Sequence, residues 1–269
     1  MNFLFNSKYR TLSLLCFAVL IPGLTSSASA DPIPPGWTCS GTCGSLGANG
    51  VVTLSPTGNS SYQYVTTTGS STTAILPTGA LGSETNGSTL ATSIFSATAG
   101  TNLNFYFNYI TSDGAGFADY AWAELFSSTN NPVALLFTAR TEPSGSIVPG
   151  TGLPAPTATL NPSSVPIIPG GPAWSPLGAS SGECFDVGCG YTGWVNSNYT
   201  IATAGDYYLK VGVTNWIDEA FDSGLAMDGV TVGGVPIVPP SAVPEPSTLM
   251  LLGTGLAGLA TSVKRKLRA

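Results

Sequence analysis

Apolar and polar residues alternate along most of the chain between positions 31 and 235, and this period of two restricts the fold more than any other feature. The clearest run, residues 103–109, places Leu, Phe, Phe and Tyr on one face and Asn, Tyr and Asn on the other. Similar runs occupy residues 51–54, 61–67, 90–97, 120–126, 133–139, 199–202, 207–213 and 225–232. Because Gly, Asn, Asp and Pro turns separate these runs, we expect an all-β fold, an antiparallel β-sandwich or jelly roll.

A proline- and glycine-rich segment, residues 141–182, interrupts the strand pattern. Nine of the 21 prolines lie between Pro143 and Pro176. Each proline removes a backbone donor and fixes φ, so the segment should form neither a helix nor a central strand. It is either a linker between two half-domains or a long loop within one sandwich. We favour the loop, because the strands after it are too few for an independent core, and we expect one domain over residues 31–240.

Charged residues are few and unevenly placed. The chain has 8 Lys and Arg, 14 Asp and Glu, and no His, for a net charge of −6. Only Arg140 and Lys210 are basic between Asp31 and Val243, against thirteen acids, so this stretch carries 2 − 13 = −11. Nucleic-acid binding is therefore excluded for the body, because phosphate contacts need clustered bases. The missing His removes the commonest general base and the usual catalytic pairs, which argues against an enzyme.

The N-terminal residues 1–30 have the pattern of a secretory signal peptide. A basic start precedes an apolar run over residues 12–21, and Ala28 and Ala30 form the small-x-small pattern that signal peptidase accepts before Asp31. An uncleaved N-terminal anchor is the alternative.

The C-terminal residues combine a short proline motif, an apolar stretch and a basic tail. The motif consists of Val243, Pro244, Glu245 and Pro246. Residues 247–263 are apolar and glycine-containing, which predicts a short transmembrane helix. The tail contains Lys264, Arg265, Lys266 and Arg268. By the positive-inside rule, the tail stays in the cytoplasm and the acidic body lies outside.

Residues 243–269 are similar to the PEP-CTERM sorting signal of exported Gram-negative proteins. This resemblance implies processing by an exosortase that recognises the Pro-Glu-Pro motif, in bacteria that also make exopolysaccharide. It implies an inner-membrane tether before processing and a cell-surface or extracellular location afterwards. A permanent anchor with chance prolines is the alternative. More loosely, residues 119–123 and 221–230 resemble the exported jelly-roll bodies of PEP-CTERM proteins of unknown function.

Four cysteines of the exported body form two close pairs. They are Cys39, Cys43, Cys184 and Cys189, and Cys16 belongs to the signal peptide. An even number in an oxidising compartment indicates two disulfides, for which three connectivities exist. We favour the two local pairings. A four-thiolate zinc site is the alternative, although the spacings are wider than those of a zinc ribbon.

Aspartates concentrate in two loop-like segments that follow long predicted strands. The candidates for a calcium site are Asp113, Asp119, Asp218, Asp222 and Asp228. Calcium accepts six to eight oxygen ligands in flexible geometry, so carboxylates on neighbouring loops suit it. The spacing does not match an EF-hand, and the alternative is that these residues form turns and cap strand ends. Calcium is the one cofactor that the pattern suggests.

Three tryptophans, Trp174, Trp194 and Trp216, lie in or beside Gly- and Pro-rich loops, where their rings could stack on sugars. The alternative is that they close the ends of the sandwich. These features favour a non-enzymatic surface or matrix protein with exopolysaccharide as a candidate partner. A second hypothesis is a glycan-active enzyme, and a third is a structural protein without a ligand. The carboxylate candidates for the enzyme are Glu124, Glu183 or Glu219 with Asp222.

Overall fold

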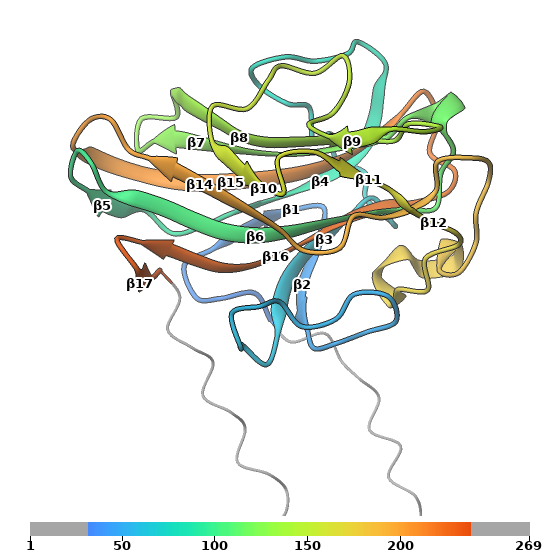
Figure 1. Cartoon of the computed structure of the whole chain (residues 1–269), viewed down its shortest axis with the longest axis horizontal. Helices are drawn as coiled ribbons and strands as arrows, with labels where there is room; N and C mark the ends of the chain where they lie inside the picture. Colours follow the sequence, from blue (N-terminus) through green and yellow to red (C-terminus); the bar gives the residue numbers. More distant parts are fainter. Residues whose placement is uncertain (1–31, 238–269) are drawn as a thin grey trace, which may run out of the picture.

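The computed structural model describes residues 32–237, which form two antiparallel sheets packed face to face (Figure 1). The predicted signal peptide with its cleavage site, the sorting motif, the span at residues 247–263 and the basic tail lie outside the described residues. Within residues 32–237, no helix is long and apolar enough to cross a membrane. The β-sandwich expected from the alternating pattern is confirmed.

One sheet, called the β15 sheet after its longest strand, has the order β1-β4-β15-β7-β8, with β5 beside β15. All its pairings are antiparallel. Its strands are β1 (Thr38–Ser40), β4 (Glu84–Ala91), β5 (Phe95–Ala97), β7 (Tyr120–Ser127), β8 (Pro132–Arg140) and β15 (Gly205–Trp216).

The other sheet, called the β6 sheet, has the order β10-β14-β6-β16-β3-β2, with β13 also beside β6. Its strands are β2 (Thr42–Leu46), β3 (Tyr62–Thr66), β6 (Asn102–Thr111), β10 (Thr159–Asn161), β12 (Ile168–Pro169), β13 (Gly190–Tyr191), β14 (Val195–Thr200), β16 (Ser223–Val232) and β17 (Val235–Pro236). A separate pair comprises β9 (Ser146–Val148) and β11 (Val165–Pro166), and the 3₁₀ helices are η1 (Ala115–Phe117) and η2 (Ser175–Ser180).

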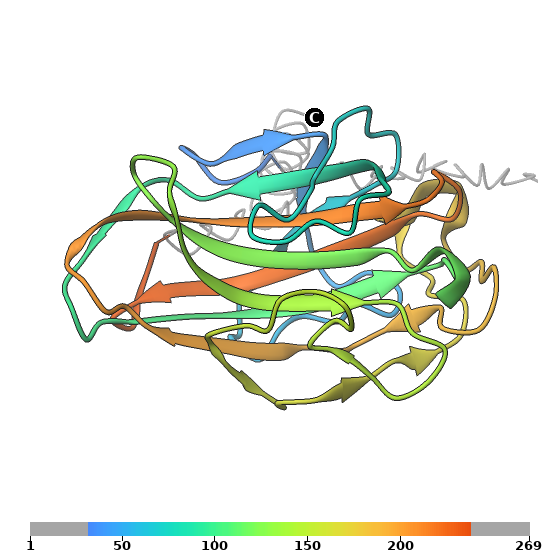
Figure 2. The ribbon, with the colours of Figure 1, turned by 90° about the horizontal axis from the view of Figure 1, so that it is seen from above.

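The core lies between the two sheets, because each long strand turns its apolar positions inward. Leu103, Phe105 and Phe107 of β6 are buried, as the period of two predicts. The Phe107 ring stacks on that of Phe137 from β8, with centroids 3.7 Å apart. The long strands of both sheets run in nearly the same direction (Figure 2). Residues of opposite parity on each strand therefore form the two outer faces of the sandwich.

Three predicted strands differ from the structure. Residues 199–202 include only the end of β14, because Ile201 bonds to Gly100 and Thr101 in the turn before β6. Residues 51–54 form only a single bridge, because Val51 donates its backbone N–H to the Ala173 carbonyl, in the loop before η2, instead of to a sheet. Residues 90–97 divide into the end of β4 and the short β5. At the break, the Thr92 hydroxyl accepts the backbone N–H of Leu209, so a side chain replaces the regular ladder contact there.

The proline- and glycine-rich segment 141–182 packs against the sandwich. It contributes β9 to β12, the short 3₁₀ helix η2 and the loop through η2 that covers part of the outer face of the β6 sheet. Ile147, Val148, Leu160 and Val165 of this segment are buried in the main core. Its strand β10 pairs only with β14, at the edge of the β6 sheet, where few ladder bonds are needed.

Candidate functional site

Four of the five aspartates predicted to bind calcium lie on loops at one end of the sandwich, and Asp228 lies apart. Asp228 is five residues beyond Ser223, where β16 begins, so about 17 Å of strand separates them at 3.3 Å per residue. Its carboxylate accepts hydrogen bonds from the Ser55 hydroxyl, from the Thr57 hydroxyl at 2.6 Å and from the Asn59 amide at 2.9 Å. Asp228 therefore fastens the loop at residues 55–59 to the β6 sheet.

Asp113 and Asp119 are both buried at the end of the sandwich. Asp119 accepts the backbone N–H of Trp216 at 2.9 Å and the Ser223 hydroxyl at 2.6 Å. Burial raises the pKa of Asp119 well above its usual range, and the neighbouring Asp113 raises it further. Burial also raises the pKa of Asp113 to about 7, with a further contribution from Asp218. Both carboxyl groups therefore retain a proton more strongly than free aspartate does.

The oxygens of these aspartates are largely engaged by the protein itself. Asp222 accepts the Thr67 hydroxyl at 2.8 Å and the Ser180 hydroxyl at 3.3 Å, in addition to the contacts of Asp119 and Asp228 above. In the part of the chain that the structure describes, no three His, Cys, Asp or Glu side chains are grouped so that they could hold a metal ion. The five aspartates thus do not converge on one point, and calcium binding stays a prediction.

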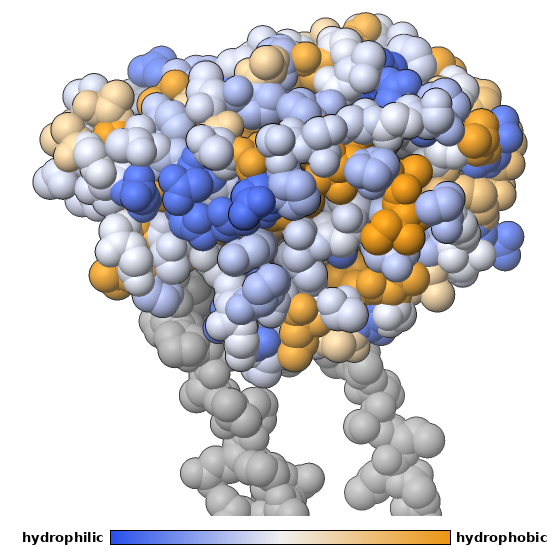
Figure 3. Space-filling view, in the orientation of Figure 1, coloured by the Kyte–Doolittle hydropathy of each residue, from blue (hydrophilic) through white to orange (hydrophobic). Residues whose placement is uncertain are grey.

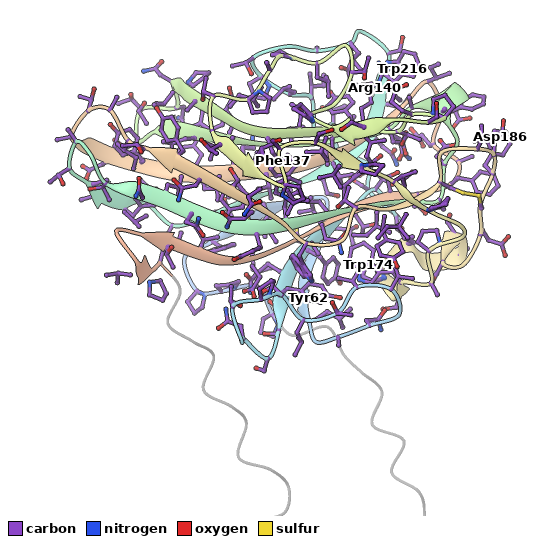
Figure 4. The ribbon with its side chains drawn as sticks, viewed as in Figure 1. Tyr62, Phe137, Arg140, Trp174, Asp186 and Trp216 are labelled. Carbon is purple, nitrogen blue, oxygen red and sulfur yellow. A yellow bond between two sulfur atoms is a disulfide. The ribbon has the colours of Figure 1, made fainter. Side chains whose placement is uncertain are left out.

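All three tryptophans predicted to stack on sugars have protein partners, and the partners of Trp174 and Trp216 occupy or cover their rings. Trp174 is buried, and its Nε1 donates to the hydroxyl of Tyr62 at 2.9 Å (both residues are labelled in Figure 4). Its ring meets that of Tyr64 edge-on. It has no surface to offer a ligand, which corrects the prediction for this residue. The Arg140 guanidinium lies 4.7 Å from the ring centroid of Trp216 and covers one of its faces.

Trp194 is held in place and partly exposed. Its Nε1 donates to the Thr53 carbonyl at 3.0 Å, and its ring meets that of Tyr62 edge-on, with centroids 5.7 Å apart. The residue directly precedes Val195, the first residue of β14, whose side chain points into the core. By the alternation of a strand, Trp194 therefore lies on the outer side of the β6 sheet.

The open part of that outer surface consists of amide and hydroxyl side chains, and we call it the amide face. It belongs to β6, β14 and β10, and its members are Asn102, Asn104, Tyr106, Thr159, Asn161, Asn196, Asn198 and Thr200. Register brings them side by side: Asn198 lies opposite Asn104, and Asn196 lies between Tyr106 and Asn161. Figure 3 shows hydrophilic residues gathered over β6 and β14 on this side of the molecule.

Hydrogen bonds orient the centre of the amide face. The Asn104 amide donates to Asn196 at 3.1 Å, and Asn196 returns a bond to Asn104 at 3.0 Å. Within residues 32–237, the side chains of Asn161 and Asn198 have no hydrogen-bond partner. No Asp, Glu, Lys or Arg occurs in β6, β10 or β14. The face therefore presents free donors and acceptors around a fixed pair and carries no charge.

The rest of the outer surface of the β6 sheet is covered by loops. Trp174 and Leu177 of the segment leading through η2 pack over the outward side chains of β3, β6 and β16, including Tyr62, Tyr64 and Ile110. A Cβ atom at Gly224 would overlap the Trp174 ring, so glycine is needed where the indole meets β16. One half of the outer surface of the β6 sheet is therefore covered by loops, and the other half, the amide face, is open. Trp194 lies beside the boundary between the two halves.

Part of the amide face was visible in the sequence as the alternating polar positions of residues 103–109. The second half, Asn196 and Asn198, follows the same period of two. What the sequence lacked was the pairing of β14 and β10 with β6, because those strands are separated from β6 by dozens of residues. No Asn or Thr is among the binding residues predicted from the sequence.

The carboxylates considered for glycan cleavage are dispersed. Glu124 is buried on the outer face of the β15 sheet, and Lys210 is the charged group acting on it. Glu183 and Glu219 are exposed on separate loops, and Asp222 is bonded to side chains of the body. The structure thus places Glu124 on a different element from the other candidates.

Both local disulfides are present. Cys39 is bonded to Cys43, and Cys184 to Cys189, as the spacing favoured. The first joins β1 of one sheet to β2 of the other, and the second closes a loop beside η1. The zinc alternative is therefore not the arrangement found.

Comparisons with known proteins give different results for the body of the chain and for its C-terminal end. No curated protein sequence matches the chain significantly. Among solved structures, the chain is similar to the enzymatically active domain of tailspike protein 4 from bacteriophage CBA120, with 11% identity and a TM-score of 0.33 over 74% of this chain. The matched part spans only 19% of that phage protein.

Two other solved structures are similar to this chain over the same share of its length. One is TmCBM61, solved in complex with β-1,4-galactotriose, with 11% identity and a TM-score of 0.31 over 74% of this chain and 88% of that one. The other is the K1 cleaved adhesin domain of Lys-gingipain from Porphyromonas gingivalis W83, with 11% identity and a TM-score of 0.33 over 74% and 91%.

The C-terminal end gives a specific match. Residues 242–266 match the family model of the PEP-CTERM protein-sorting motif, which confirms the resemblance seen at residues 243–269. Such a signal implies export and processing by an exosortase. The chain carries a PEP-CTERM sorting motif and is an exported protein with a β-sandwich body.

Proposed function

We propose that this exported protein is a non-enzymatic component of the cell surface or extracellular matrix that binds an uncharged polysaccharide on the amide face. The observation that carries the proposal is the face itself, an uncharged array of amides and hydroxyls with the fixed ring of Trp194 beside it. Processing at the C-terminal motif then delivers the sandwich to the polysaccharide outside the cell.

The chemistry of the amide face suits sugars. A carboxamide both donates and accepts, so it can bond two neighbouring hydroxyl groups of a sugar ring. The paired Asn104 and Asn196 are oriented before any ligand arrives, which lowers the entropy lost on binding. From Trp194 to Thr200 the strand extends about 20 Å, long enough for several sugar units of an extended chain.

The charge distribution favours an uncharged ligand. Between Asp31 and Val243 there are two basic residues against thirteen acids, so an anionic polysaccharide approaches a body of the same sign. The amide face has no Lys or Arg to offset this repulsion. A neutral chain meets neither repulsion nor the loss of hydration that burying a charge entails.

Cleavage of the bound glycan has less support than binding. Glycoside hydrolysis uses two carboxyl groups that flank the bond, and the strands of the amide face contain none. Asp228 of β16 lies opposite Tyr106 of the amide face, but its carboxylate is committed to hydrogen bonds from Ser55, Thr57 and Asn59. Binding without turnover is the function that this surface supports best.

Calorimetric titration tests the proposal. The full-length protein is kept in a detergent without a sugar headgroup and titrated with neutral oligosaccharides, such as cello-, laminari-, manno- and galactotetraose, and with oligogalacturonate. We expect a neutral oligosaccharide to bind and oligogalacturonate to bind at least tenfold more weakly. Binding of oligogalacturonate alone, or of no sugar in the set, contradicts the proposal.

Variants locate the site. Trp194→Ala removes the ring beside the face, and a loss of about 1.5 kcal/mol corresponds to roughly tenfold weaker binding. Asn196→Ala removes one half of the central amide pair and should weaken binding by a similar factor. Asn131→Ala, which removes an exposed amide in the turn between β7 and β8, is the matched control and should leave affinity unchanged. Equal affinity in all three variants would place the sugar elsewhere.

A further inference from the structure

A second open site lies on the outer face of the β15 sheet, and we call it the lysine groove. It has a volume of about 590 Å³ and is lined by side chains that include Thr38, Thr89, Ser93, Asn130, Tyr208 and Lys210. One wall is the edge strand β1, which the Cys39–Cys43 disulfide ties to β2. Because the core separates the two sheets, this groove opens on the side of the sandwich opposite the amide face.

An aromatic ring is fixed within the lysine groove. Tyr208 stacks on Phe126, with ring centroids 5.3 Å apart and planes 11° from parallel. Its hydroxyl donates to the Asn130 side-chain oxygen at 3.0 Å, which leaves the Asn130 amide nitrogen free for a ligand. The ring and the amide are therefore oriented by the protein, as in a binding site that forms before its ligand arrives.

Lys210 of the groove has a buried partner. It lies directly across from Glu124 in the pairing of β15 with β7. Glu124 is fully buried, and neither of its carboxylate oxygens accepts a hydrogen bond from any residue of the described range. Burial raises the pKa of Glu124 and lowers that of Lys210. The Thr78 hydroxyl and then Lys210 act against the first shift, and Glu124 acts against the second. Lys210 is thus the charged group that acts on a carboxylate beneath the groove wall.

We propose that the lysine groove is a second sugar-binding site, in which Lys210 and the Asn130 amide donate to hydroxyl groups of an uncharged sugar unit and Glu124 acts as a positioning residue that neutralises Lys210. The local charge of the pair is zero, so the groove binds hydroxyl groups rather than carboxylates. Tyr208 supplies the ring beside which the sugar lies.

Two sugar sites on opposite faces make the protein a cross-linker of polysaccharide chains. This consequence rests on the function proposed for the amide face, whereas binding in the lysine groove does not. A single molecule holding two chains gains from the second contact without further affinity at either site.

Stoichiometry tests the second site. The full-length protein is titrated with the neutral tetrasaccharides named above. We expect the wild type to bind two sugars per chain. The double variant Asn196→Ala with Trp194→Ala should bind one, and the paired change Lys210→Met with Glu124→Gln should also leave one. The paired change removes both charges together, so no charge is left buried alone. If the wild type binds one sugar per chain and the paired change does not affect it, the second site is refuted and the amide face is supported. If that one sugar is lost only with the paired change, the groove is supported and the amide face is refuted. No binding of any neutral sugar overturns both.

The single variant Glu124→Gln tests the positioning role. It leaves Lys210 without a counter-charge, so we expect oligogalacturonate to gain affinity by tenfold or more at low salt while the neutral sugar loses affinity. Tyr208→Ala provides a second variant that leaves the charge pair intact, and it should weaken the neutral sugar without any gain for the acidic one. Unchanged selectivity in folded Glu124→Gln refutes the role. In a solution of soluble neutral polysaccharide, the wild type should raise turbidity, and variants lacking either site should not; turbidity that survives the loss of one site contradicts cross-linking.

Discussion

Raising the pH from 5 to 8 should destabilise the exported body, because two buried carboxyl groups at the end of the sandwich hold protons that the unfolded chain releases. Burial raises the pKa of Asp113 from 3.8 to about 7, and that of Asp119 well above its usual range. Between pH 3.8 and about 7, folded Asp113 holds a proton that the unfolded chain has already released. Stability is therefore full below pH 4 for this contribution and falls as the pH rises through 7.

The magnitude follows from the shift. From pH 5 to the folded pKa of about 7, two pH units at about 1.4 kcal/mol each set a ceiling of about 3 kcal/mol for Asp113. Water around the loops screens part of this, so we expect a loss of about 2 kcal/mol by pH 8. For a body of this size, 1 kcal/mol corresponds to roughly 2–4 °C, so the melting temperature should fall by about 4–8 °C.

Thermal unfolding followed by circular dichroism measures the effect, with chelator present in every sample. Asp113→Asn cannot ionise and should have a smaller fall between pH 5 and pH 8. Asp206→Asn is the matched control, since Asp206 is an exposed acid bonded to Ser96, and its profile should follow the wild type. A wild-type melting temperature that is constant or rises over this range refutes the reasoning. Added calcium that restores stability above pH 7 would support the calcium prediction.

Three further outcomes are expected. Trp174→Ala should lower the free energy of unfolding by about 3–5 kcal/mol in chemical denaturation, because it empties a buried indole site and leaves the Tyr62 hydroxyl unpaired; a loss below 1 kcal/mol would mean that the loop cover does not stabilise the sheet. Gly212→Ala should cost about 1–3 kcal/mol, because its Cβ would lie 2.6 Å from the Trp122 ring, and an unchanged melting temperature would contradict this packing. In cells with an exosortase, the mature protein should lack the mass of the segment beyond the Pro-Glu-Pro motif, and Glu245→Ala should retain it; identical masses would indicate an anchor.

The long strands could be predicted from the sequence because their period of two is strong. Phe105 and Phe107 were assigned to the buried face, and both are buried. Residues 51–54 were predicted as a strand as well, yet they form only a single bridge, since Val51 bonds to a loop more than a hundred residues away. Local patterns specify whether a segment can be a strand, and distant partners decide whether it becomes one.

The candidate site was harder to predict for the same reason. Trp174 was expected at the surface because its neighbours are Gly and Pro, but the loop folds back and places the ring over β3 and β16. Trp194 lies in a similar sequence context and stays partly exposed, held by Thr53. The pairing of Asn104 with Asn196 depends on β14 lying next to β6, which no local signal indicates. The charge deficit of the body, by contrast, is purely compositional and was fully visible.

The most direct test of the central claim is the binding of neutral polysaccharide by the amide face. Affinity electrophoresis compares the mobility of the native protein in gels with soluble neutral β-glucan, galactan or mannan, with alginate, and with no polymer. We expect a neutral polymer to retard the wild type equally at low and high salt, since no ion pair is involved. The double variant Asn104→Ala with Asn196→Ala should reduce this retardation, and Asn131→Ala should not. Retardation by alginate alone, or equal retardation of both variants, would contradict binding at the amide face.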